Sequence, residues 1–207
     1  MRRFVLIGQT ASASGDYSVE DLPGSSGRLD VLLRAIRAAL LVSHGLRRNV
    51  LVYLVLRGGG VTPRLLRING PTAKFLRPDE RSLATLVKKT LVAVPTPSQS
   101  FVEVRPGLEL RLGDVAEILA EVGATPCFLL HEGGQDVREQ ALAADDAWFF
   151  IGDHLGFDAG SLALLEAHGC QPISVGPVSL HSDDVVTLVS NELDRRFGVT
   201  TNPDGER

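Results

Sequence analysis

The sequence predicts an α/β protein built around a parallel sheet. Three short apolar runs, over residues 126–131, 147–151 and 171–175, alternate with segments of helical periodicity, as strands joined by crossover helices do. The uninterrupted, β-branched run 49–56 is typical of a strand buried on both faces. Because the three later strands all end in polar, glycine-containing loops, we expect these loops to meet at one edge of the sheet and to hold a ligand there.

The first half begins with a strand, a loop and a helix. The apolar run 2–8 predicts the strand, and the Gly- and Ser-rich segment 9–27 predicts a long loop. A helix is expected from position 27 or 28 to Gly45, because apolar residues recur there at steps of three and four. Residues 57–63 are glycine-rich but lack the Lys-Ser/Thr of a phosphate-binding loop, so a flexible turn is expected.

The elements that follow lead into the second half. A short hairpin is expected over 64–70 and 73–78, and a helix begins at Pro78, with two acids in its first turn that suit the helix dipole. Residues 95–100 read as a linker. The remaining predicted elements are a strand at 102–106 and helices at 112–123, 136–143, 161–169 and 181–196.

Composition indicates one soluble globular domain. With 207 residues, 44% of them hydrophobic, the chain can bury a full core, and we expect residues 1–200 to form it and 201–207 to be a flexible tail. No apolar run is long enough to cross a membrane, and the N-terminus lacks the pattern of a secretory signal. These observations predict a cytoplasmic location and no membrane partner.

Charge divides the chain into two unequal halves. Residues 1–111 carry 14 Arg and 3 Lys against 8 acidic residues, whereas residues 112–207 carry 4 Arg against 17 acidic residues. A basic face of this kind, to which Lys88 and Lys89 would contribute, would attract a polyanion such as RNA. The alternative is that acidic helices merely solvate the second half.

Neither the cysteines nor the histidines predict a metal centre. Cys127 and Cys170 lie in or beside apolar runs without a short mutual spacing, so we expect neither a zinc site nor a disulfide. His131, His154 and His181 each follow a strand, but no ligand accompanies them at a fixed short spacing, so they are expected to cap strands or orient loops. Ser179, His181 and Asp183 lie too close together in sequence for a catalytic triad.

Five segments occur in a familiar order: GRLDVLLR, PDERSLATLVKK, FLLHEGG, FFIGDHLGF and ISVGPVSLHSDDVVTLVSNELDRR. In this order the chain resembles, over nearly its whole length, the archaeal tRNA pseudouridine N1-methyltransferases of the SPOUT superfamily, and the last two segments are the specific ones. The resemblance implies helices on both faces of the sheet, a C-terminal trefoil knot and a homodimer. It also implies an RNA-facing half, 1–111, and a knotted half, 112–200, that binds S-adenosyl-L-methionine.

The family's cofactor contacts fall on the loops after the predicted strands. Glycine at 152 and 176 would let backbone approach a flat adenine closely, and Pro177 would stiffen its loop. Apolar side chains would wall the rest of the pocket. The cofactor-binding residues implied by the resemblance are Leu130, Gly152, Val175, Gly176, Pro177, Val178, Ser179, Leu180 and Val185.

One departure from the family pattern bears on mechanism. Asp184 and Val185 stand where the archaeal relatives have His-Cys, so a thiol at that position is not needed for any activity that this chain retains. Methylation of carbon 5 of uridine usually needs a cysteine nucleophile, whereas N1 of pseudouridine only has to lose its proton while attacking the methyl group. The sequence therefore favours transfer to nitrogen, in which alignment of the two reactants can supply roughly 7–11 kcal/mol of the barrier.

Arginines in the first half are candidates for RNA contacts. Arg28 and Asp30 are similar to a pair in the related ribosomal-RNA pseudouridine methyltransferases, which implies that Asp30 accepts a hydrogen bond or the proton from the base and that Arg28 holds a phosphate. Arg34, Arg81 and Arg105 would add backbone contacts. The alternative for Asp30 is an exposed helical ion pair with Arg34 worth ~0.3–0.5 kcal/mol.

The resulting hypothesis is N1-methylation of pseudouridine in the T-loop of tRNA. The target base would have to be splayed out of its stack, with Tyr17, Phe75 or Phe157 available for stacking. Two alternatives stay open. One is the same chemistry on another RNA, for example ribosomal RNA, and the other is a non-catalytic RNA-binding α/β protein.

Overall fold

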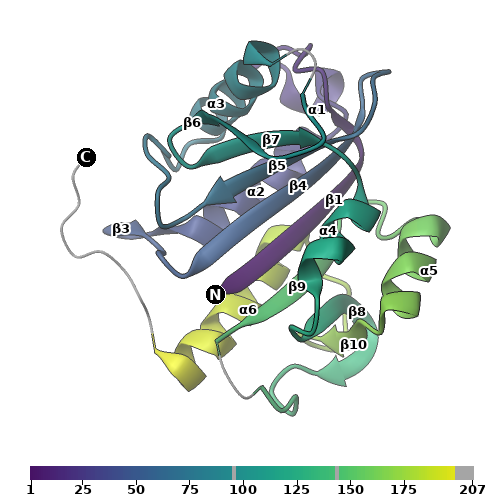
Figure 1. Ribbon diagram of the computed structural model, residues 1–207. Helices are drawn as coiled ribbons and strands as arrows, with labels where there is room; N and C mark the ends of the chain where they lie inside the picture. The colour runs from purple at the N-terminus through teal and green to yellow at the C-terminus, as the bar shows by residue number, and fades with distance from the viewer. Residues whose placement is uncertain (95–96, 143–144, 199–207) are drawn as a thin grey trace.

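The computed structural model describes residues 1–94, 97–142 and 145–198, and its centre is one eight-stranded sheet (Figure 1). In spatial order its strands are β10 (Gln171–Ser174), β8 (Cys127–Asp136), β9 (Ala147–Gly152), β1 (Arg2–Ser12), β4 (Val50–Gly58), β5 (Arg64–Asn69), β7 (Leu108–Leu112) and β6 (Val102–Arg105). The five strands from β10 to β4 are parallel, and the rest are antiparallel to their neighbours. The predicted parallel sheet is therefore only part of a mixed sheet, because β4 turns into β5 and β6 into β7 through short loops, as antiparallel strands allow.

Helices cover both faces of the sheet, as the family resemblance implied (Figure 1). One face carries α2 (Leu29–Leu40), α3 (Glu80–Ala93) and α6 (Ser182–Phe197), and the other carries α4 (Val115–Val122) and α5 (Ala159–His168). Along β1, Phe4 and Leu6 point into the core beneath α2, while Val5 and Ile7 point into the core on the opposite face, beneath α4. Successive side chains of a strand alternate between faces, which is why strands covered on both sides appear as unbroken apolar runs.

Several predicted element boundaries in the first half are wrong. β1 continues to Ser12, and the predicted loop 9–27 contains the short helix α1 (Leu22–Ser25). The helix predicted to reach Gly45 ends at Leu40, because the chain then forms a small hairpin of β2 (Leu41–Val42) and β3 (Gly45–Leu46). The predicted hairpin of 64–70 with 73–78 is also wrong, because β5 pairs with β4 and β7, and 73–78 forms no strand.

The helix predicted at 136–143 is likewise wrong over its described residues. β8 extends to Asp136, and turns follow because the backbone N–H of Val137 donates to the carbonyl of Ser174 on β10 (2.8 Å) rather than starting a helical ladder. Ala143 lies outside the described residues, as do residues 95–96 of the predicted linker and the whole of the predicted tail 201–207.

Ion pairs join arginines of the first half to acids of the second. Arg2, whose side chain is fully buried, donates to Asp145 and Asp194, and Arg47 donates to both oxygens of Asp194 at 2.7 and 2.6 Å. Burial alone would raise the pKa of Asp194, but the hydrogen bonds from Arg47 and Arg2 lower it below its ordinary value. These contacts fasten α6 to the first strand.

The end of α6 also contacts the segment that follows β8. The guanidinium of Arg196 donates to the carbonyls of Val137, Arg138 and Gln140 at 2.9, 2.7 and 2.6 Å. The C-terminal helix therefore packs against the segment that follows β8. The trefoil knot itself stays a prediction.

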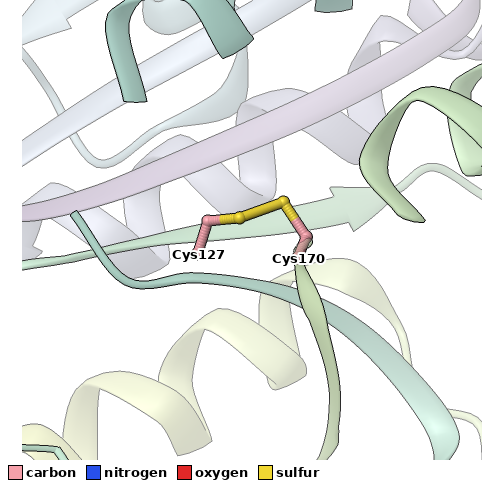
Figure 2. Close-up of a disulfide and its surroundings, with 2 residues drawn as sticks. All are labelled: Cys127 and Cys170. Atoms are coloured by element: carbon pink, nitrogen blue, oxygen red, sulfur yellow. A yellow bond between two sulfur atoms is a disulfide. The ribbon is translucent and has the colours of Figure 1, made fainter. Parts of the chain in front are cut away.

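The expectation of two unpaired cysteines is wrong, because Cys127 and Cys170 form a disulfide with their Cα atoms 4.8 Å apart (Figure 2). The physical reason is the register of two parallel strands. Gln171 of β10 stands opposite Phe128 of β8, so the residues just before them are brought together. The two cysteines are 43 residues apart in sequence, and nothing in the sequence reveals that register.

Candidate functional site

The middle of β8, at residues 130–132, and the carboxyl ends of β9 and β10 line one cleft with a cavity volume of about 460 Å³. Eight of the nine predicted cofactor residues line it, and Pro177 does not. The eight are Leu130, Gly152, Val175, Gly176, Val178, Ser179, Leu180 and Val185. The three segments predicted as loops therefore contribute to one cleft, but the first of them, after residue 131, belongs to β8 and is not a loop. That these residues bind a cofactor stays a prediction.

The absence of a side chain has a different structural explanation at each of two glycines in the cleft, Gly152 and Gly176. A Cβ on Gly152 would come within 2.4 Å of the backbone of Gly156, so glycine is required at 152 by the protein's own turn. A Cβ on Gly176 would meet no atom within 4 Å and would project into open space. Only Gly176 therefore retains the explanation that a missing side chain leaves room for a ligand.

Polar groups hold the loops of the cleft in place. Ser182 Oγ donates to the carbonyl of Gly152 (2.8 Å), and the N–H of Gly176 donates to Ser174 Oγ (3.0 Å). The carboxylate of Asp153, whose side chain is 1% exposed, accepts from the backbone N–H groups of Gln9 and Leu155, both at 2.8 Å. These hydrogen bonds fix the loops that follow β9 and β10 before any ligand binds.

Sequence reasoning missed several of the residues that line the cleft. Asp153 directly follows the predicted cofactor glycine on β9, and its place after a buried strand was the one signal that could have identified it. Ser182 begins α6, where a serine is usually assigned to helix capping. The other lining residues that were not predicted include His131, Glu132, Leu155 and Ser174.

Asp30 lies at the start of α2 between two arginines. Arg28 Nε donates to Asp30 Oδ1 (3.0 Å), Arg28 Nη2 to Oδ2 (3.3 Å) and Arg34 Nη1 to Oδ2 (3.1 Å). The Asp30 side chain is 3% exposed, so the alternative of an exposed helical ion pair does not describe it. Burial would raise the pKa of Asp30, but the hydrogen bonds from Arg28 and Arg34 lower it, which makes the carboxylate a weak proton acceptor.

The arginine-aspartate cluster of Arg28, Asp30 and Arg34 adjoins the first turn of α6. Arg34 Nε lies 4.0 Å from Asp183 Oδ2, and Asp183 follows Ser182, which lines the cleft. Arg34 Nη1 also lies 3.7 Å from Glu80 at the start of α3. The cluster thus connects α2 to the cleft on one side and to α3 on the other.

The other predicted RNA contacts do not come together. Arg81 is 70% exposed beside Glu20, and Arg105 lies on β6 next to α3. Tyr17 is not available for stacking on a base, because its ring is buried and its hydroxyl donates to the carbonyl of Ala84 (2.8 Å). Phe75 is 81% exposed, and Phe157 lines the cleft.

Two features are absent from the described part of the chain, a cluster of metal ligands and a membrane-spanning helix. No group of three or more His, Cys, Asp or Glu residues there could hold a metal ion, so His131, His154 and His181 do not form a triad with one another. Among the same residues, none of the helices has the length and apolar character needed to cross a membrane.

The mixed sheet, with helices on both faces and a cleft at the ends of its parallel strands, has a solved counterpart. The crystal structure of Archaeoglobus fulgidus Nep1 bound to S-adenosylhomocysteine superposes with a TM-score of 0.64 over 93% of this chain and 97% of that one, at 16% identity. This likeness shows the fold. The predicted SPOUT-type α/β fold class is therefore confirmed.

Sequence comparison gives the family. Residues 1–197 match the model of a family described as "Putative SAM-dependent RNA methyltransferase". Two relatives named tRNA (pseudouridine(54)-N(1))-methyltransferase come from Methanosarcina mazei (43% identical, covering 94% of this chain and 92% of the relative) and Methanococcoides burtonii (39% identical, covering 95% and 98%). The chain belongs to this family of RNA methyltransferases, and the predicted dependence on S-adenosyl-L-methionine is confirmed.

Proposed function

We propose that this chain transfers a methyl group from S-adenosyl-L-methionine to N1 of pseudouridine 54 in the T-loop of tRNA. The observation that carries the proposal is the identity of 39–43% to relatives named for this activity, over 94–95% of the chain. The cleft lined by β8, β9 and β10 supports it, since it gathers eight of the residues implied as cofactor contacts.

The cleft fits the proposed cofactor in size and chemistry. Its volume of about 460 Å³ lies in the range of small-molecule sites, and open space faces Gly176 where the adenine would approach. Glu132 and Asp153 also line the cleft and place negative charge near a sulfonium. When bound, the cofactor would supply an electrophilic methyl group, which the apolar side chains Leu130, Val178 and Leu180 would shield from water.

The arginine-aspartate cluster is proposed to position the RNA substrate. Asp30 holds Arg28 and Arg34 in fixed directions, and each guanidinium keeps further N–H donors for phosphate or base oxygens. Because the pKa of Asp30 is lowered, its role is to orient rather than to take the N1 proton. The main catalytic contribution would then be alignment of N1 with the methyl group.

The homodimer and the cytoplasmic location are also part of this proposal. Large apolar side chains are exposed around the cleft and along α6, which a second copy of the chain would cover. They are Leu155, Val178, Leu180 and Leu188, between 38% and 60% exposed. Cytosolic tRNA would be the substrate of such a dimer, with residues 1–111 facing the RNA and 112–200 binding the cofactor.

Nucleoside analysis of tRNA tests the proposal. Purified protein, S-adenosyl-L-methionine and tRNA containing pseudouridine at position 54 should yield N1-methylpseudouridine there, and the same tRNA with uridine at 54 should yield none. Methylation of ribosomal RNA alone would favour the alternative substrate. Calorimetry that detects no cofactor binding at millimolar concentration would favour the non-catalytic RNA-binding alternative.

A further inference from the structure

A second cavity, of about 450 Å³, lies on the N-terminal half of the molecule and is separate from the cleft. It lies along the second half of α3, between the loop that precedes α1 and the end of β6. We call it the α3 groove. Its lining includes three cations, Lys88, Lys89 and Arg105, over the side chains of Val19, Thr85 and Val92.

The positive charge of the α3 groove is not neutralised within the described part of the chain. No carboxylate there forms an ion pair with Lys89 or Arg105, whereas Arg81 near the start of the same helix has Glu20 as a partner. Lys88 Nζ donates to the carbonyl of Tyr17 and lies over its ring, but it has no carboxylate partner among the described residues. The groove thus gathers three cations where most arginines of this chain have an acidic neighbour.

Arg105 also has a donor without an acceptor. Its Nε is buried and makes no hydrogen bond to any described residue. A buried N–H without a partner costs free energy, so such groups usually have a ligand, a water or an ion as their partner. Arg105 therefore lines the cavity with an uncompensated charge, and its buried Nε has no acceptor among the described residues.

The position of the α3 groove relates it to the cleft. Glu80, at the start of α3, contacts Arg34 of the arginine-aspartate cluster, and Lys89 follows nine residues later on the same helix. At 1.5 Å per residue this separation is about 14 Å along the helix axis. One extended polyanion can therefore contact both sites, with a few nucleotides between them.

We propose that the α3 groove binds phosphodiester groups of the RNA substrate, through Lys88, Lys89 and Arg105, a few nucleotides away from the base that is methylated. The inference rests on the proposed function only in taking RNA as the substrate. The exposed face of Val92, at 55%, offers an apolar surface for a ribose beside the bound phosphates. Charge complementarity selects a phosphate backbone rather than an acidic side chain, because three cations converge on one cavity.

The salt dependence of tRNA binding tests this inference. Each phosphate contact contributes about 0.7–0.9 to the slope of log K against log salt, so losing two contacts should reduce the slope by about 1.4–1.8. We would measure binding of unmodified tRNA at about 50 to 200 mM salt for Lys89→Gln, Arg105→Gln and the double variant. The KM for tRNA should rise about tenfold in the double variant while kcat and cofactor affinity stay unchanged.

Arg138→Gln is the matched control, because Arg138 is 75% exposed and pairs with Asp136 in the acidic half. It should leave the slope unchanged. Arg105→Lys, which keeps the charge, should recover most of the lost slope, and the exposed Lys89 can be tested even if Arg105 variants do not fold. A slope unaffected by Lys89→Gln and Arg105→Gln, or equally reduced by Arg138→Gln, overturns the inference. If the slope falls but N1-methylpseudouridine is not formed, the groove stands and the proposed function fails.

Discussion

Arg2 and Asp194 are 192 residues apart in sequence, and Nη1 of the arginine lies 2.5 Å from Oδ1 of the aspartate. The Arg2 side chain is fully buried, and Arg47, which directly follows β3, donates to the same carboxylate of Asp194. The first strand and the last helix are therefore joined by a charge pair whose arginine is fully buried. Neither residue lines the cleft, so this pair concerns stability rather than catalysis.

Replacing Asp194 by Asn should destabilise the protein by about 1–3 kcal/mol, because the buried Arg2 would keep only Asp145 as an anionic partner and Arg47 would lose its carboxylate. Urea unfolding should show a lower midpoint with an unchanged m-value. Asp184→Asn is the control: it removes the same charge from the same helix at an exposed position and should change stability by no more than about 0.5 kcal/mol. Equal effects of the two substitutions would show that Asp194 contributes only long-range charge.

The protein should lose stability as the pH falls below about 4. Asp30 and Asp194 both have a pKa lowered below 3.8 in the folded state, so the unfolded chain takes up protons first. Their contribution is fully present above the unfolded-state pKa and is lost as the pH falls through the folded-state pKa. Urea midpoints measured from pH 7 to pH 3 should therefore decline less steeply for Asp194→Asn than for the unaltered protein. Parallel curves would contradict this assignment.

The secondary structure was predictable where burial leaves a clear pattern. The runs at 49–56 and 147–151 were found as strands because both of their faces are covered, which keeps the sequence apolar throughout. The pairing of β5 with β4 and β7 was not predictable, because register and antiparallel partners depend on contacts between distant segments. The segment 136–143 was predicted to be a helix, yet over its described residues β8 ends at Asp136 and turns follow, because the N–H of Val137 bonds to β10.

The disulfide is the clearest case of information that only the fold supplies. Reducing it, or replacing both cysteines by Ser, should destabilise the protein by about 4 kcal/mol in the chain-entropy model, because the two cysteines are 43 positions apart in sequence. Urea unfolding with and without a phosphine reductant measures this difference. The double Ser variant should be insensitive to the reductant. If the unaltered protein is equally insensitive, the two thiols are not joined in solution.

Gly176→Ala should weaken cofactor binding without weakening the fold. The added methyl would meet no protein atom within 4 Å, yet it would occupy the space in which we expect adenine, and overpacking costs about 1–3 kcal/mol, or tenfold or more in affinity. Calorimetry with S-adenosyl-L-methionine and a thermal melt measure the two effects. Gly152→Ala should instead lower the melting temperature, since its methyl would collide with the backbone of Gly156. Unchanged affinity in Gly176→Ala would remove this loop from the cofactor site.

Asp30→Asn should lower turnover while leaving cofactor affinity unchanged. The amide would keep the shape of the side chain but lose the charge that holds Arg28 and Arg34, and misplacing a substrate by about 1 Å can cost roughly 100-fold in rate. Single-turnover methylation of tRNA and calorimetry with the cofactor separate these quantities. Turnover equal to that of the unaltered protein would show that the cluster has no part in the reaction.

The candidate site was predictable only in part, and for a particular reason. Periodicity located the strand ends, so the edge of the sheet was known, but Leu130, Gly176 and Val185 were assigned from a family resemblance rather than from their own chemistry. Asp153 and Ser182 were missed because their importance lies in backbone contacts across loops, which leave no spacing in the sequence. The state of Asp30 could not be foreseen, because its burial depends on how α2 packs.

The ion pairs between the two oppositely charged halves have a consequence for assembly. Besides the pair of Arg2 with Asp194, Arg57 donates to Asp114 and Asp158 at 2.6 and 2.5 Å. Basic residues of the first half therefore contact acidic residues of the second half at more than one place. Two separately expressed fragments, cut between residues 112 and 113, should therefore attract each other over a distance and reconstitute the sheet. Their rate of recombination should fall steeply as ionic strength rises, since the attraction that guides the encounter is screened.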